Sequence, residues 1–189
     1  MKYFKKLDNL PTFDLYNEFK KLNIDWYQNQ VCINTVPDSE DDYKLGCGSL
    51  QYNWEAAETR VNNSGEEYTH VPEYNIKYTE KDFTVLCSLF VDTLFESVYN
   101  SITKEYNIGR IRLMKSKPKT CLSWHKDTSP RLHFPVKTQE GCIMVIEDEC
   151  FHIPNNEWYW TNTTVKHTAF NGSFEDRIHL VATILEEEK

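Results

Sequence analysis

The spacing of apolar side chains changes about halfway along the chain. Apolar residues recur every three or four positions over residues 12–22 and again over residues 79–102. This spacing places them on one face of a helix. After Asn107 the period becomes two, which is typical of strands with one buried face. The pattern therefore predicts two amphipathic helices followed by a region of strands.

The second half of the chain predicts about eight short strands separated by turn residues. In one of them, Arg131 and His133 share a face, and Leu132 and Phe134 share the other. The expected strands are 110–114, 120–124, 131–136, 141–146, 149–153, 158–161, 165–170 and 177–185. Many short antiparallel strands are typical of sandwiches and closed barrels. We expect a mainly β fold, a double-stranded β-helix of the cupin-like jelly-roll type, with the N-terminal helices flanking it.

The length and composition favour a single domain. The chain has 189 residues, of which 40% are hydrophobic, enough to build one core. We expect residues 1–105 to form a helical and loop support region and residues 106–189 to form the β-helix core. Residues 40–75 mix aromatic and polar side chains, which suits either a loop over a pocket or irregular packing. The aromatic residues of this region include Trp54, Tyr68 and Tyr74.

The charge balance argues against nucleic-acid and membrane partners. The net charge is −8 and the isoelectric point is about 5.3, which disfavours a basic surface for phosphates. The sequence contains no run of about 18 apolar residues, and residues 1–10 lack the apolar segment of a signal peptide. Six cysteines without a Cys-x-x-Cys pair are typical of reduced thiols. We expect a cytoplasmic protein, and the sequence leaves its oligomeric state open.

The strongest chemical signal is the pair His125 and Asp127 together with His167. On an extended chain, positions two apart point to the same side, so an imidazole and a carboxylate can bind one metal. Two histidines and one carboxylate that leave open coordination positions are the ligand set of non-haem Fe(II) oxygenases. A His-x-Asp pair alone is also common in surface turns, so the residues that follow matter.

The turn residues Asn171 and Gly172 predict a hairpin that joins the last two strands. If the hairpin is centred on Gly172, His167 and Arg177 lie directly opposite each other, with Cβ atoms about 5 Å apart. A guanidinium group pairs with a carboxylate through two hydrogen bonds, as a dicarboxylate co-substrate would require. We therefore expect His167 and Arg177 to line one pocket side by side.

The order and spacing of these motifs resemble the aspartyl/asparaginyl β-hydroxylase family of Fe(II)/2-oxoglutarate dioxygenases. The similarity is greatest to the compact members of bacteria and their phages, and it extends over about residues 108–185. The segments that carry it are 109–114, 117–118, 125–127, 131–136, His167 and 177–181.

The resemblance implies an Fe(II) centre and a 2-oxoglutarate site. His125 and His167 match the iron-binding histidines of the family, and Asp127 supplies a carboxylate that some animal members lack. The positions that bind 2-oxoglutarate in the family correspond here to Arg131, His133 and Arg177. Arg131 and His133 could contact the substrate instead. His179 shares a strand face with Arg177 but has no partner at ligand spacing, and we assign it no role.

The expected activity is hydroxylation of an amino-acid side chain, of the Asp/Asn type or Pro, in a free amino acid or in a peptide or protein. The reaction would convert 2-oxoglutarate and O2 to succinate and CO2. Two alternatives remain open at this point. One is a metal-dependent cupin enzyme that does not use 2-oxoglutarate, and the other is a non-catalytic jelly-roll module that binds a peptide or sugar. The sequence does not identify the prime substrate or the carbon that would be hydroxylated.

Overall fold

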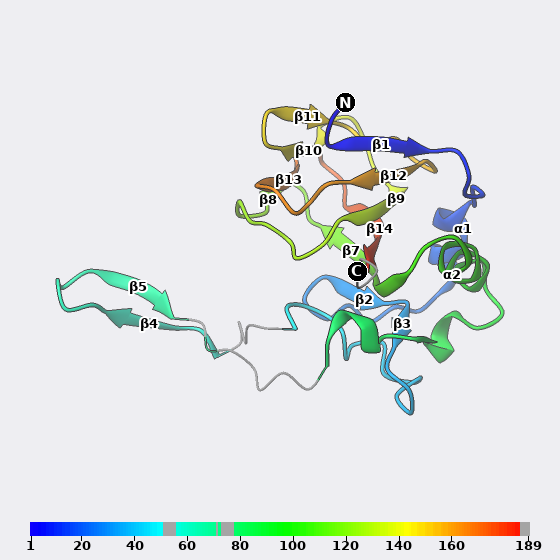
Figure 1. Cartoon of the computed structure of the whole chain (residues 1–189), viewed down its shortest axis with the longest axis horizontal. Coiled ribbons are helices and arrows are strands. Elements are labelled where there is room, and N and C mark those ends of the chain that lie inside the picture. Colours follow the sequence, from blue (N-terminus) through cyan, green and yellow to red (C-terminus); the bar gives the residue numbers. More distant parts are fainter. Residues whose placement is uncertain (51–55, 71, 73–77, 186–189) are drawn as a thin grey trace.

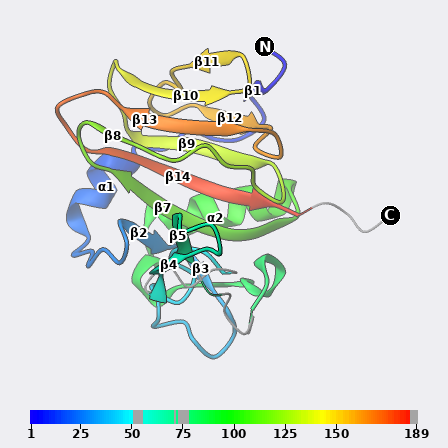
Figure 2. The same ribbon diagram turned by 90° about the vertical axis from the view of Figure 1, so that its left-hand side faces the viewer.

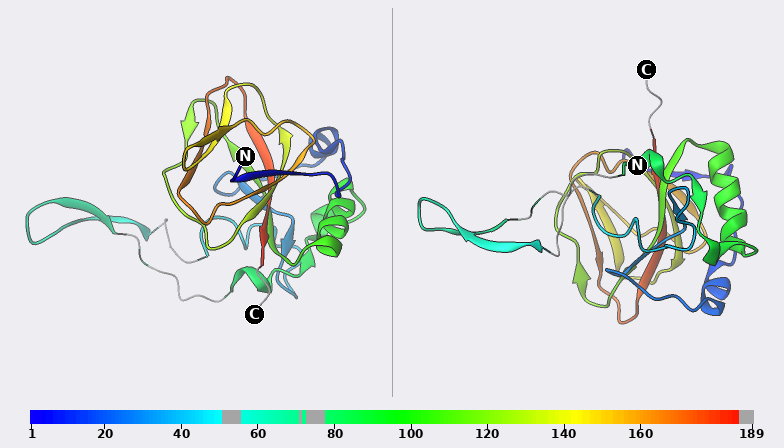
Figure 3. Two further views of the ribbon diagram at one scale, coloured as in Figure 1. Left: turned by 45° about the horizontal axis from the view of Figure 1, so that its top comes forward. Right: turned by 90° about the horizontal axis from the view of Figure 1, so that it is seen from below.

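The protein is built around two antiparallel sheets that pack face to face. The computed structural model describes residues 1–50, 56–70, 72 and 78–185. The larger sheet contains, in spatial order, β1 (Phe4–Leu7), β12 (Trp158–Thr161), β9 (Arg131–Lys137), β14 (Arg177–Ile184), β7 (Ile108–Ser116) and β2 (Gln30–Cys32). The smaller sheet contains β11 (Glu149–Phe151), β10 (Cys142–Ile146), β13 (His167–Asn171) and β8 (Thr120–Cys121). Together the strands wrap into a barrel (Figure 1, Figure 3), which confirms the expected mainly β, jelly-roll fold.

The two faces of the larger sheet have opposite character. Leu132, Phe134 and Leu180 face outward and pack with apolar side chains of the helices α1 (Leu15–Lys21) and α2 (Leu94–Glu105). The alternating residues of the same strands, such as Arg131 and His133, face the interior of the barrel. The main hydrophobic core therefore lies outside the barrel, between the sheet and the helices. Figure 2 shows the helices behind the strands of this sheet.

The first predicted helix is confirmed within its range, but the second is wrong over its first half. Instead of one helix over residues 79–102, α2 begins only at Leu94. Val85 and Leu86 form the short strand β6, which pairs with β3 (Asn34–Thr35). Asp92 has φ of 59°, outside the helical region, and the hydroxyl of Thr93 then caps α2 by accepting from the amide of Phe95 at 3.1 Å. The remaining turns of this stretch are the 3-10 helices η2 (Glu80–Asp82) and η3 (Ser88–Phe90).

The first 105 residues contribute more than helices and loops. Strands β1 and β2 extend the larger sheet at its two edges. Strands β4 (Glu58–Val61) and β5 (Glu67–His70) form a separate hairpin that extends away from the barrel (Figure 1). Trp54 and Tyr74, which belong to the segment expected to form either a loop over a pocket or irregular packing, lie outside the described residues. Among the described helices, none has the length and apolarity needed to cross a bilayer.

The packing of α2 predicts a strong difference between neighbouring positions. Phe95→Ala should lower the free energy of unfolding by about 3–5 kcal/mol, because Phe95 is wholly buried and its loss leaves a cavity. Leu94→Ala removes a side chain that is 37% exposed and should cost less than about 1 kcal/mol. Urea unfolding of both variants measures the difference, and equal losses would contradict this orientation of the helix.

Candidate metal centre and the polar interior

Backbone pairing brings the three candidate metal ligands together. The amide of His125 donates to the carbonyl of His167 at 3.0 Å, and the amide of His167 donates back at 2.9 Å. This bridge places the two imidazole rings 4.2 Å apart between centroids. Two residues further on, the amide of Asp127 donates to the carbonyl of Thr163 at 2.8 Å. The positions of all three side chains are therefore set by backbone hydrogen bonds.

The side-chain atoms converge on one point. One carboxylate oxygen of Asp127 lies 3.9 Å from Nε2 of His125, and the other lies 3.8 Å from Nε2 of His167. One ligand atom from each residue can be chosen so that all three lie within 4.8 Å of one another. Three such atoms can share a single ion, with one histidine buried and the other two residues more accessible.

Both histidines have the tautomer that a metal needs. Nδ1 of His125 donates to the carbonyl of Ser123 at 2.7 Å, and Nδ1 of His167 donates to the carbonyl of Val165 at 3.0 Å. With the proton on Nδ1, the Nε2 lone pair faces Asp127 and is available for a metal. Burial also lowers the pKa of His167, which favours the neutral, metal-binding form.

The predicted hairpin that pairs His167 with Arg177 is wrong. Strand β13 pairs with β10 and β8, whereas β14 pairs with β7 and β9, so the two strands belong to different sheets. His167 lies opposite Ile146, and Arg177 lies opposite Ser116. The side-chain amide of Asn171 donates to the carbonyl of Ser116 at 2.9 Å. This contact stabilises the loop between β13 and β14, which crosses from the smaller sheet to the larger one instead of forming a tight turn.

Arg177 and His179 nevertheless lie in the barrel interior. Arg177 donates from NH2 to Nδ1 of His179 at 3.0 Å. The proton of His179 is then on Nε2, and this buried atom has no hydrogen-bond partner among the described residues. Nε of Arg177 likewise has no hydrogen-bond partner among the described residues. Burial lowers the pKa of Arg177 to about 10, and no described carboxylate lies within ion-pair distance of it.

His133 completes this polar interior. Its ring centroid lies 5.9 Å from that of His179, and neither of its ring nitrogens has a partner among the described residues. Burial, followed by the charge of Arg177, lowers its pKa well below 6.5. A buried donor or acceptor left unpaired costs about 1–3 kcal/mol, so several at one place indicate a site for a polar ligand.

Arg131 connects the two parts of the site. Its Nε lies 3.2 Å from a carboxylate oxygen of Asp127, and NH1 donates to the hydroxyl of Ser129 at 2.6 Å. The side chain is buried and lies on the same face of β9 as His133. Arg131 therefore orients the carboxylate of the candidate metal centre.

The sequence pattern alone assigns no role to His179. Because Arg177 and His179 are two positions apart in one strand, they share a face. In the structure their side chains are joined by a hydrogen bond. This signal was present in the sequence, but an i, i+2 hydrogen bond between side chains becomes evident only with the geometry.

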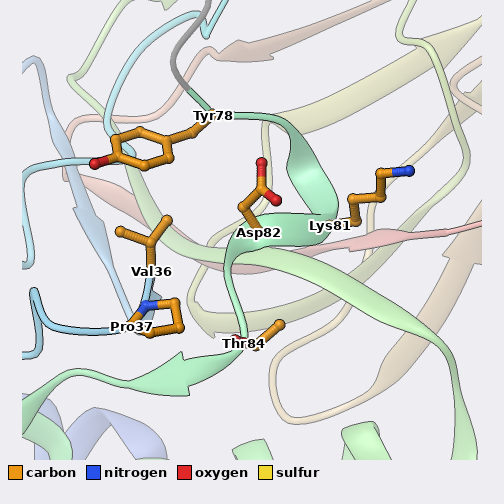
Figure 4. A pocket seen from close by; sticks show the side chains of 6 residues that line it. All are labelled: Val36, Pro37, Tyr78, Lys81, Asp82 and Thr84. Atoms are coloured by element: carbon orange, nitrogen blue, oxygen red, sulfur yellow. The ribbon is translucent and has the colours of Figure 1, made fainter.

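Two surface hollows lie near the 3-10 helix η2. One, of about 440 Å³, is lined by Val36, Pro37, Tyr78, Lys81, Asp82 and Thr84 (Figure 4). The carboxylate of Asp82 is already bonded to the amide and hydroxyl of Thr79. The other, of about 450 Å³, includes Glu80 and Ser129 in its lining. None of the three candidate metal ligands lines either hollow.

The buried histidines predict that the protein loses stability in mild acid. The folded-state pKa values of His133 and His179 are well below the unfolded value of about 6.5. The unfolded chain therefore binds more protons below that pH, and stability falls as the pH decreases from about 6.5. Each ring contributes up to about 1.4 kcal/mol per pH unit to this slope.

Replacing one ring should reduce the slope. Urea unfolding of His179→Gln between about pH 6.5 and pH 5 should show a slope smaller by up to about 1.4 kcal/mol per pH unit. His70→Gln, which replaces a histidine of the projecting hairpin outside the barrel interior, is the control variant. An unaltered slope in His179→Gln would contradict the assignment of His179 as a buried neutral ring.

The sequence matches a known protein family over most of its length. The model of the family described as aspartyl/asparaginyl beta-hydroxylase matches residues 40–186. A search of curated proteins found no match. Solved structures with similar folds include AviO1 from Streptomyces viridochromogenes, at 12% identity and a TM-score of 0.44, covering 97% of this chain and 90% of that one.

Two further solved structures match a smaller part of the chain. An oxidoreductase of the 2OG-Fe(II) oxygenase family from Burkholderia pseudomallei is 15% identical, with a TM-score of 0.40, covering 53% of this chain and 60% of that one. A cupin domain from Bordetella pertussis is 15% identical, with a TM-score of 0.36, covering 41% and 81%. The family match spans well over half of the sequence, and the chain belongs to the aspartyl/asparaginyl beta-hydroxylase family.

Proposed function

We propose that the protein is an Fe(II)- and 2-oxoglutarate-dependent dioxygenase that hydroxylates an amino-acid side chain. The observation that carries the proposal is the cluster of His125, Asp127 and His167 beside a buried, cationic interior. The overall reaction is substrate C–H plus O2 plus 2-oxoglutarate, giving C–OH, succinate and CO2.

The donor set fits iron(II). Two neutral imidazoles and one carboxylate form the facial triad that leaves coordination positions open. Iron bound there would supply the activation of O2 and the oxidative decarboxylation of 2-oxoglutarate. The protein contributes the two fixed tautomers, and Arg131 holds the carboxylate of Asp127 in place. Such outer contacts orient metal ligands and strengthen metal binding.

The interior fits a dicarboxylate. Arg177 is a buried cation without a carboxylate partner among the described residues, and a distal carboxylate of 2-oxoglutarate would supply one. The bond to His179 fixes the orientation of the guanidinium group. His133 lies beside this pair, with its ring centroid 5.9 Å from that of His179, and it shares a strand face with Arg131, which contacts Asp127. It is placed to donate a hydrogen bond to the same co-substrate.

Succinate formation tests the reaction class. Protein purified without oxygen and given Fe(II), ascorbate, 2-oxoglutarate and then O2 should release succinate in a manner that depends on both Fe(II) and O2. His125→Ala should reduce this to background, because the metal loses one of three ligands. His70→Ala is the matched control and should retain the activity of the wild type. Absence of succinate, combined with no thermal stabilisation by Mn(II) and 2-oxoglutarate, would favour a binding module instead.

The affinity for 2-oxoglutarate tests the role of Arg177. Arg177→Gln should raise the KM for 2-oxoglutarate about 10- to 100-fold, because a charge-assisted contact worth about 1.5–3 kcal/mol is lost. The value of kcat should change less. Arg60→Gln, in the exposed hairpin, is the control. An unchanged KM in a folded Arg177→Gln variant would point to a metal-dependent cupin enzyme that does not use 2-oxoglutarate.

A further inference from the structure

A second group of cations lies on the inner face of the larger sheet, beyond the proposed co-substrate site. Arg110 and Arg112 are only 4% and 8% exposed, and both lie on β7. Arg112 pairs with Val181 of β14, and Val181 pairs in turn with His133 of β9. Directly opposed residues share a face, so Arg112 and His133 both face the interior, two strands apart. At about 4.8 Å per strand, about 10 Å separates their positions in the sheet.

Arg110 already has an anionic partner. It donates from NH2 to a carboxylate oxygen of Glu80 at 2.8 Å and from NH1 to the carbonyls of Gly46 and Gly48. The other oxygen of Glu80 accepts from the hydroxyl of Thr183 at 3.0 Å. Although burial opposes it, the charges of Arg110 and Arg112 hold the pKa of Glu80 below its usual value. Glu80 is therefore an anion that Arg110 engages directly.

Arg112 has only neutral partners. NH1 donates to the side-chain oxygen of Gln30 at 2.8 Å and to the carbonyl of Gly48 at 3.2 Å. Within the described part of the chain, Nε is buried without a hydrogen-bond partner, and Glu80 pairs with Arg110 rather than with Arg112. Burial, followed by repulsion from Arg110, lowers its pKa to about 10. The charge of Glu80 partly offsets that of Arg112, but the buried Nε donor has no partner, and an unpaired buried donor is costly unless a ligand supplies an acceptor.

The unpartnered side of Arg112 has the shape that a carboxylate requires. Nε and NH2 form one edge of the guanidinium fork, which can donate two parallel hydrogen bonds to the two oxygens of a carboxylate. Gln30 and Gly48 hold the fork through NH1, so this edge has a fixed position. Gly48 has φ of 75°, a conformation that favours glycine, and this places its carbonyl against both arginines.

We propose that Arg112 binds a carboxylate of the prime substrate, so that the substrate is a molecule with a free carboxylate, such as an amino acid. This inference rests on the proposed function, which assigns Arg177 and His133 to 2-oxoglutarate. Arg112 lies opposite Val181, whereas Arg177, the position proposed for the distal carboxylate of 2-oxoglutarate, lies opposite Ser116, four residues away along each strand. A small substrate anchored at Arg112 would thereby be kept apart from the co-substrate.

The alternative is that Arg112 has a structural role only and stabilises the loop at Gly46–Gly48 through its hydrogen bond to Gly48. A binding measurement without turnover separates the two roles. The protein is loaded with Mn(II) and 2-oxoglutarate in the absence of O2 and titrated with the twenty L-amino acids and their α-carboxamides. At least one acid should bind at least about tenfold more tightly than its amide, as expected for a charge-assisted contact. Comparison of Asp with Asn and of Glu with Gln distinguishes a side-chain carboxylate from an α-carboxylate.

Arg112→Gln should reduce the preference for the acid over its amide to about one, while the Kd for 2-oxoglutarate stays within about twofold of the wild type. Arg60→Gln is the control and should retain the preference. If Arg112→Gln does not fold, Arg112→Lys replaces it, and the loss of the two-donor edge should still reduce the preference several-fold.

Several results would overturn the inference. One is that no carboxylate binds the loaded wild-type protein more tightly than its amide. Another is that a folded Arg112 variant keeps the full preference. A third is that Arg112→Gln weakens 2-oxoglutarate more than Arg177→Gln does, which would assign Arg112 to the co-substrate. Failure of the wild-type protein to bind 2-oxoglutarate at all would instead contradict the proposed function, so the two failures can be told apart.

Discussion

The burial of cations inside the barrel is the constraint on which the rest of the structure depends. Arginines in a dry interior are tolerated only where anions or hydrogen-bond acceptors surround them. The fold offsets this cost by placing its hydrophobic core on the other face of the same sheet, against α1 and α2. The outer face therefore carries the main hydrophobic core, and the inner face holds the polar groups beside a smaller apolar cluster that includes Phe4, Met144 and Tyr159.

The bridge between His125 and His167 links this interior to the smaller sheet. Its two backbone hydrogen bonds set both imidazoles before any metal binds, and their Nδ1 protons are fixed by carbonyls. Arg131 then reaches Asp127 from the larger sheet at 3.2 Å. The candidate metal centre is thus assembled from both sheets, and a change in how they pack would alter the geometry of all three ligands.

Local patterns predicted those features that depend on local geometry. The period of two identified β9 and its two faces, since successive residues of a strand alternate sides. The spacing of apolar residues every three to four positions predicted a helix over all of residues 79–102. That prediction failed in the first half, because β6 pairs with β3, which is distant in sequence. The prediction of a hairpin after β13 also failed, because the chain there crosses to the other sheet and the side chain of Asn171 donates a hydrogen bond to the carbonyl of Ser116. The spacing of the metal ligands was visible in the sequence, whereas the role of His179 depends on its bond to Arg177.

Strand β14 lies at the centre of the larger sheet and divides its inner surface. It lies between β9, which carries His133, and β7, which carries Arg112. On its own inner face, Arg177 and His179 lie near one end, and Val181 separates the two neighbouring groups. Arg112 is held by Gln30 and Gly48, which contact neither His133 nor Arg177, so the Arg112 side can vary independently of the proposed co-substrate side. Substitutions in the loop at Gly46–Gly48 would therefore change the surroundings of Arg112 without disturbing the candidate metal ligands, which lie on the opposite sheet and its bridge.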